Sequence, residues 1–207
     1  MAVNPVMLKW AKRAALVLLG VVVLGALLFF ALPWLVIGPA DQPREADVIL
    51  HFALAEELHG DEYAVELLRQ GQAKHIVCLS AQASWQVYAA DYARAHLIEL
   101  GAPADQVSVL HTPRLECRKQ VLPFIAEYVK QQGWRRVLMV VEPTVSRADR
   151  RVAAPIFARA GLELEITYSP LDYTILTTGW WRKHWKTQRF SGEALDGFFD
   201  FFFAECW

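Results

Sequence analysis

The feature that most constrains this chain is an uninterrupted apolar stretch near its N-terminus. Residues 14–32 read AALVLLGVVVLGALLFFAL, nineteen residues without a charged or strongly polar side chain. At about 1.5 Å per residue, an α-helix of this length reaches roughly 28 Å, close to the thickness of the hydrocarbon core of a bilayer. A soluble domain rarely buries a helix that is apolar on every face. The stretch therefore predicts a transmembrane helix over residues 14–35.

The residues on either side of this stretch bear on its processing and orientation. A cleaved secretory signal is the alternative interpretation, but its apolar core usually spans about 7–15 residues and ends at a small-residue cleavage site. Here the stretch is longer and runs into residues 33–37 (PWLVI). Residues 9–13 carry three Lys or Arg side chains, whereas only Arg44 follows within a dozen positions. Since positive flanks stay in the cytoplasm, we expect an uncleaved, single-pass protein of the bacterial inner membrane, with residues 1–13 cytoplasmic and the main domain periplasmic.

The rest of the chain divides into a short linker and one domain. Residues 36–46 contain Gly38, Pro39 and Pro43, which is typical of a linker leading away from the membrane. Residues 47–207 suffice for one domain with a sizeable core but not for two. The formal net charge is −1, which argues against a nucleic-acid partner.

The cysteine content is low. Three cysteines are too few for a disulfide framework. Cys78 lies in an apolar run and is expected to be a buried thiol, whereas Cys117 and Cys206 either pair in an oxidising compartment or stay free. No CxxC motif or His/Cys cluster with metal-ligand spacing occurs, so we expect neither a metal nor a cofactor.

Beyond the linker, strand-like and helix-like patterns alternate. Apolar runs of strand length lie at residues 47–52, 75–80, 107–110, 136–141 and 162–168. Helices are expected at 56–70, 85–100 (N-capped by Ser84), 115–132, 146–159 (kinked or split at Pro155) and 191–204 (capped by Ser191). Strands that are apolar throughout indicate burial on both faces. The pattern predicts an α/β fold with a doubly wound, mostly parallel sheet in three layers.

Five sequence segments follow the transmembrane segment and linker in a fixed order. They are residues 46–49 (ADVI), 67–80 (LLRQGQAKHIVCLS), 92–107 (YARAHLIELGAPADQV), 135–151 (RRVLMVVEPTVSRADRR) and 179–195 (GWWRKHWKTQRFSGEAL). As an ordered set they resemble the bacterial ElyC/SanA/YdcF-type envelope domain family over about residues 44–204. The resemblance implies a Rossmann-like sheet. It also implies a role in cell-envelope or surface-polysaccharide assembly.

The polar motifs of that family are changed in this chain. Its Gly-rich turn after the first strand is represented by residues 50–55 (LHFALA), and its Ser-Gly-Gly by residues 80–82 (SAQ). Its Asn-Thr-x-Glu-Asn stretch is represented by residues 115–120 (LECRKQ). After the fourth strand, residues 142–148 (EPTVSRA) keep Arg-Ala but lack the family's histidine. Glycines let backbone amides approach an anion, and histidine is the usual acid or base near neutral pH. The loss of both the glycines and the histidine indicates that the scaffold is kept without catalytic activity.

A few polar residues remain as candidates for a weak ligand site at the carboxyl ends of the strands. His51 ends the first strand at the switch point where doubly wound folds bind ligands, and it is either a ligand contact or a satisfied polar residue. Arg147 can clamp an anion or pair with Glu142 or Asp149. Asp47, at the opposite end of the first strand, is expected to hold backbone groups or an arginine. The remaining candidates on this rim are Ser80, Arg114 and Glu116.

The end of the chain combines aromatic and basic residues. Trp180, Trp181, Trp185 and Phe190 lie among four Lys or Arg residues and precede a helix that carries five phenylalanines. Some of these phenylalanines are expected to cover the sheet, but five exceed one buried face. Tryptophan mixed with Lys and Arg is typical of a membrane interface or a protein partner. We therefore expect these aromatic residues to contact the lipid bilayer or another membrane or periplasmic protein.

Two functions from different classes follow. The first is a non-catalytic accessory or assembly factor of the cell envelope, anchored in the inner membrane. The second is an envelope enzyme or ligand-binding protein that acts on a lipid-linked or nucleotide-like substrate. The changed glycine and histidine motifs favour the first. Open space beside His51, Ser80, Glu142 and Arg147 would favour the second.

Overall fold

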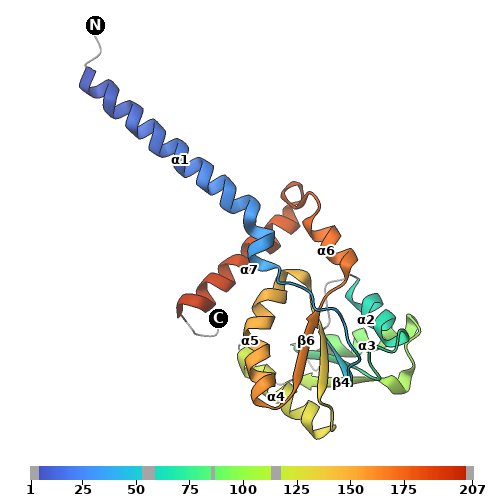
Figure 1. Cartoon of the computed structure of the whole chain (residues 1–207). Coiled ribbons are helices and arrows are strands. Elements are labelled where there is room, and N and C mark those ends of the chain that lie inside the picture. Colours follow the sequence, from blue (N-terminus) through green and yellow to red (C-terminus); the bar gives the residue numbers. More distant parts are fainter. Residues whose placement is uncertain (1–4, 53–58, 85–86, 113–117, 204–207) are drawn as a thin grey trace.

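A computed structural model covers the chain and describes residues 5–52, 59–84, 87–112 and 118–203. Its first element is a 32-residue helix, α1 (Pro5–Val36), which stands out from an α/β domain (Figure 1). Within α1, residues Lys12–Val36 are long and apolar enough to cross a membrane. The predicted transmembrane segment is thus one helix, although α1 also continues toward the N-terminus, and Pro33 lies inside it without ending it.

The domain is built on one sheet. Five parallel strands lie in the order β4-β2-β1-β5-β6, and the short β3 pairs antiparallel with the end of β2. Taken in chain order, the parallel strands have the arrangement 3-2-1-4-5 of a Rossmann-like sheet, with the switch point between β1 and β5. The strands are β1 (Val48–Phe52), β2 (Ile76–Ser84), β3 (Val87–Tyr88), β4 (Val107–Thr112), β5 (Arg136–Val140) and β6 (Glu163–Thr167).

Helices cover both faces of the sheet, which confirms the predicted three layers. One face packs against α2 (Gly60–Arg69) and α3 (Ala89–Glu99), and the other against α4 (Arg118–Gln131) and α5 (Ser146–Arg159). Alternate residues of β1 serve the two faces: Ile49 joins the first cluster, while Val48 and Leu50 join the second. Two-sided burial explains why the strands are apolar throughout.

Several local expectations are confirmed. The α2 and α5 helices end just before Gly71 and Gly161, whose φ angles of 73° and 76° suit glycine at the end of a helix. The Asp47 carboxylate accepts hydrogen bonds from the backbone N–H groups of Arg135 and Arg136, both at 2.8 Å, and so ties β1 to β5. These bonds also lower the pKa of Asp47 below its ordinary value.

Other expectations are wrong at helix boundaries. Ser84 does not cap the second helix of the domain, because β2 runs through Ser84 and α3 begins at Ala89. Pro155 does not divide α5, which is continuous over Ser146–Arg159. The last helix, α7 (His184–Phe203), begins seven residues before the expected Ser191, whose hydroxyl instead donates to the Gln188 carbonyl inside the helix.

The sequence pattern missed one helix altogether. This is α6 (Pro170–Thr177), which follows β6 and is N-capped by the Ser169 side chain. The short η3 (Trp180–Arg182) then leads into α7. The end of α1, α6, η3 and α7 enclose a third apolar cluster, separate from the two on the sheet, consisting of Val36, Ile37, Tyr168, Leu176, Trp180 and Phe190. In Figure 1, α7 passes across the base of α1.

Candidate functional site

The predicted ligand residue at the end of β1, His51, is fully buried on the side of α2 and α3. Its Nε2 lies 2.6 Å from Oδ1 of Asp61 on α2, and Oδ2 of Asp61 lies 2.7 Å from Nδ1 of His96 on α3. Burial by itself would raise the pKa of Asp61, but the hydrogen bonds and charges of the two histidines lower it overall. His51 therefore joins β1 to α2 through its Nε2, while its Nδ1 is buried without a hydrogen-bond partner among the described residues.

The other candidates at the strand ends also bond to the protein itself. Ser80 Oγ accepts a hydrogen bond from the backbone N–H of Ala90 at 2.9 Å, at the start of α3. Glu142 is buried, accepts a hydrogen bond from the Thr144 hydroxyl and forms an ion pair with Arg189 of α7. Arg189 was not predicted, and Glu142 does not pair with Arg147. Arg114, Glu116 and Cys117, like Cys206, lie outside the described residues.

Arg147 binds the carboxyl end of the apolar helix. Its Nη2 donates to the backbone carbonyls of Trp34 and Ile37, both at 2.9 Å. The last carbonyls of a helix lack partners within the helix and carry the negative end of its dipole, so a guanidinium stabilises them. The preceding residue, Ser146 at the start of α5, accepts a hydrogen bond from the Gly38 N–H at 2.9 Å. The first turn of α5 is therefore hydrogen-bonded to the residues at which the chain leaves α1.

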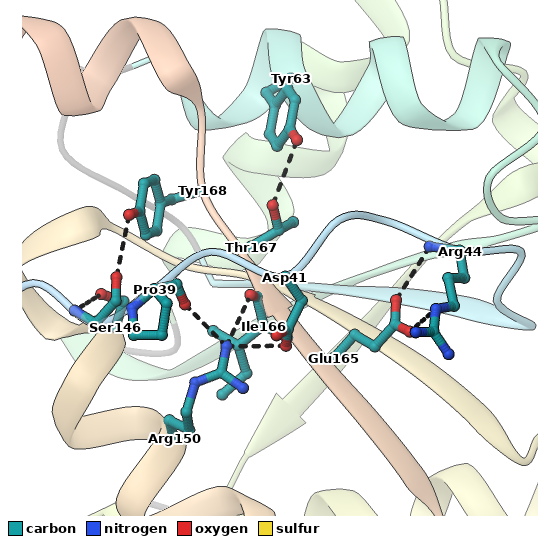
Figure 2. A network of polar contacts seen from close by, with 11 residues as sticks. Pro39, Asp41, Arg44, Tyr63, Ser146, Arg150, Glu165, Ile166, Thr167 and Tyr168 are labelled. Carbon is teal, nitrogen blue, oxygen red and sulfur yellow. Dashed lines mark hydrogen bonds and ion pairs between the residues drawn. The ribbon is translucent and has the colours of Figure 1, made fainter.

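The contacts continue along the predicted linker, as Figure 2 shows. Arg150 Nη2 donates to the Pro39 carbonyl at 3.0 Å and to the Asp41 carboxylate at 2.8 Å. Asp41 also pairs with the edge of β6, since its N–H donates to the Ile166 carbonyl at 2.9 Å and its Oδ2 accepts from the Ile166 N–H at 2.8 Å. The Tyr168 hydroxyl donates to the Gly38 carbonyl at 3.0 Å.

Residues 36–46 are consequently a docked segment rather than a free linker. We call the contacts of residues 34–41 with α5, β6 and Tyr168 the junction. The junction gives fixed partners to backbone groups of five residues, which an untethered linker would leave to water. These residues are Trp34, Ile37, Gly38, Pro39 and Asp41. The junction therefore fixes the position of the domain relative to α1.

A cavity of about 530 Å³ lies beside the junction. It is mainly apolar, and it is bounded by the end of α1, the start of α5, α6 and η3. Its lining residues include Phe30, Trp34, Arg147, Tyr173, Thr177 and Trp181. Its volume falls in the range of about 300–1,000 Å³ that is typical of small-molecule sites. Of the four described candidates His51, Ser80, Glu142 and Arg147, Arg147 lines this cavity.

The aromatic residues expected at an interface divide into two groups. Trp180 and Phe190 are buried, at 2% and 0% exposure, and so pack inside the protein instead of offering a surface to a partner. The ring of Trp180 is tilted against that of Phe29 of α1, with centroids 4.7 Å apart, and meets Phe190 edge to face, with centroids 5.2 Å apart. Trp181 and Trp185 are 46% and 37% exposed. Trp180 and Phe190 are thus part of the apolar cluster that holds α1, whereas Trp181 and Trp185 keep exposed surface, although Trp181 also meets Phe30 of α1 edge to face.

Two buried polar contacts near this site gave no signal in the sequence. Lys186 of α7 donates to the carbonyls of Ile175 and Thr178 and so closes the end of α6. Asp172 of α6 accepts hydrogen bonds from His59, at 2.7 Å from its N–H, and burial raises the pKa of this carboxyl group. Both join segments whose proximity depends on the unpredicted α6.

Comparison with protein-family models gave no match, and comparison with curated proteins gave none either. The resemblance to the ElyC/SanA/YdcF-type family therefore stays a prediction that rests on the sequence segments alone.

Proposed function

We propose that this chain is a single-pass inner-membrane protein whose domain lies on the periplasmic side and acts as a non-catalytic accessory or assembly factor of the cell envelope. The observation that carries the proposal is the use of the candidate polar residues. His51, Ser80 and Glu142 bond to α2, α3 and α7, and Arg147 bonds to α1. Side chains engaged in this way stabilise the architecture, which favours a structural role over catalysis.

The membrane location is supported by α1 and its flanks. Residues Lys12–Val36 form an apolar helix that is not buried inside the domain, so this surface needs a lipid environment. The orientation rests on the basic residues 9–13. Alkaline phosphatase fused after Trp207 should be active, and a cytoplasmic reporter at the same position should be inactive. The reverse pattern would overturn the proposed topology.

The accessory function is supported by the exposed part of the aromatic tail. Trp181 and Trp185 offer large apolar contact areas beside exposed Arg182 and Lys183, a combination that concentrates binding energy at protein interfaces. A photo-crosslinking amino acid placed at 181 or 185 in cells should give one defined protein adduct. The same amino acid at Tyr92, an exposed aromatic position on α3, is the matched control and should not.

A functional comparison separates this proposal from catalysis at the strand ends. In cells that depend on the protein for envelope integrity, the double substitution Trp181→Ala, Trp185→Ala should impair growth in detergent, while Ser80→Ala should not. If Ser80→Ala impairs growth at normal protein levels and the double variant does not, the strand ends carry the function and the proposal fails.

The second candidate, a ligand-binding protein for a lipid-linked substrate, is favoured by one observation. The cavity of about 530 Å³ lies against the apolar helix, at the place where a membrane lipid would meet the domain. A nucleotide-like substrate has no comparable support.

A further inference from the structure

We propose that the cavity beside the junction binds one phospholipid of the outer leaflet, with its acyl chain along Phe30 and Trp181 and its phosphate beside Arg147. The proposal rests on the membrane location given under the proposed function, but not on the accessory function. It concerns a defined site on the domain, as distinct from the lipid that surrounds any transmembrane helix.

The cavity spans a range of depths along α1. Phe30 lies inside the apolar stretch, two residues before Leu32, whereas Trp34 and Ile37 lie beyond it. At about 1.5 Å per residue, these positions place Phe30 roughly 3 Å inside the hydrocarbon boundary and Ile37 roughly 8 Å outside it. The headgroup region of one leaflet is about 5–8 Å thick. The cavity therefore extends from acyl-chain depth to phosphate depth.

The inner end of the cavity, at Phe30, is apolar. The rings of Phe30 and Trp181 meet edge to face, with centroids 5.6 Å apart, and Trp180 forms the adjoining wall. Trp181 is 46% exposed although it sits beside a membrane helix. Apolar walls open at hydrocarbon depth are filled by a hydrocarbon chain, because water there would lose hydrogen bonds.

The outer end of the cavity carries the positive charge of Arg147. A guanidinium has five N–H donors, and the contacts of Arg147 to Trp34 and Ile37 use Nη2. Within the described part of the chain, its Nε and Nη1 make no hydrogen bond, and the residue is exposed. Arginine is well suited to bind phosphate through such a pair of donors. Arg147 can therefore hold α1 and a phosphate together.

Two threonines of α6 offer a matched pair for testing the site. Thr177 lines the cavity, whereas Thr174, one turn earlier, does not appear in its wall. Each hydroxyl donates to the carbonyl four residues before it: Thr177 to Tyr173 at 2.7 Å, and Thr174 to Pro170 at 3.0 Å. A Thr177→Trp substitution fills the cavity, and Thr174→Trp adds the same side chain outside it at the same cost in local hydrogen bonding.

The experiment uses the full chain in vesicles of phosphatidylglycerol and phosphatidylethanolamine that contain a phospholipid with a photoreactive diazirine in its acyl chain. After illumination and digestion, mass spectrometry locates the adducts. Wild-type protein should carry adducts on α6 or η3 in addition to α1. Thr177→Trp should lower the α6 and η3 adducts about fivefold or more, while Thr174→Trp leaves them within about twofold, as a specific concave site requires.

The results that overturn the proposal are distinct. Adducts confined to residues 14–32 in the wild-type protein mean bulk lipid contact only. If an excess of an isoprenyl phosphate removes the α6 and η3 adducts and an equal excess of unlabelled phospholipid does not, the occupant is a different lipid. Extraction of the same membranes with alkaline carbonate distinguishes a failure of the membrane location from a failure of the lipid site. A chain released by carbonate contradicts the membrane location itself, whereas a retained chain without α6 and η3 adducts contradicts the lipid site alone.

Discussion

Adding one methyl group at Gly38 tests whether the junction holds the domain on α1. A Cβ at this position would lie 3.0 Å from Cα and 3.1 Å from N of Arg147, both backbone atoms in the first turn of α5. Gly38 cannot easily move away, because its N–H donates to Ser146 and its carbonyl accepts from Tyr168. The Gly38→Ala variant must therefore shift the junction or strain it.

The expected cost follows from the contacts at stake. Forcing an extra carbon into a packed site costs about 1–3 kcal/mol, and a lost hydrogen bond adds about 1 kcal/mol. We therefore expect Gly38→Ala to lower the free energy of unfolding by about 1–4 kcal/mol, depending on whether a hydrogen bond of the junction is lost. For a domain of this size, each kcal/mol corresponds to about 2–4 °C in Tm. Circular dichroism of the full chain in detergent measures this shift.

A matched glycine substitution serves as the control. Gly192 lies within α7, and a Cβ there would have no heavy atom within 4 Å. Alanine is the better helix former by about 1 kcal/mol, so Gly192→Ala should leave Tm unchanged or raise it. Opposite responses of the two variants would separate a packing effect at the junction from a general effect of replacing glycine.

A distance measurement adds the geometric consequence. Spin labels at the exposed positions Leu24 on α1 and Leu171 on α6, in a variant with the native cysteines replaced by alanine, should give one narrow distance distribution. Gly38→Ala should broaden it, because α1 would no longer be fixed to the domain. If Gly38→Ala keeps both the wild-type Tm and the narrow distribution, the junction is not the rigid contact inferred here.

The remaining predictions concern the core and its titrating groups. Val140→Asp places a carboxylate at a fully buried position of β5 and should cost several kcal/mol, so chemical denaturation should show no folded baseline for this variant. Burial raises the pKa of Cys78 to about 12, so this thiol should resist maleimide in the folded protein and react in urea. The hydrogen bond to Asp61 raises the pKa of His96, and this stabilisation is complete below about pH 6.5 and lost as pH rises through the raised pKa. Because His96 is half exposed, urea titrations at about pH 6 and pH 8 should differ by about 0.2–1 kcal/mol more for the wild type than for His96→Asn. Equal pH responses of the two proteins would contradict this role of His96.

Periodicity in the sequence was sufficient to predict the membrane-length helix and the layered sheet. A run such as residues 14–32 can only be helical in lipid, and strands apolar on both sides can only lie between helices. Asp47 at the start of β1 was predictable too, because a carboxylate beside a strand end finds backbone N–H groups nearby. The helix and the strands depend on residues that are close together in the chain, whereas Arg135 and Arg136, the partners of Asp47, are 88 and 89 positions away from it.

Tertiary structure alone decided what the polar residues do. Arg147 was a candidate anion clamp, yet it binds carbonyls of residues 34 and 37, more than 100 positions away. Glu142 pairs with Arg189 across 47 positions, and Trp180 packs on Phe29. Residues 36–46 have the composition of a free linker but are docked, because α5 and β6 present donors and acceptors along their path. Hydrophobic periodicity is a property of one segment and can be recognised in its sequence. The partner of a polar group depends on how the whole chain folds, so no local pattern encodes such pairs.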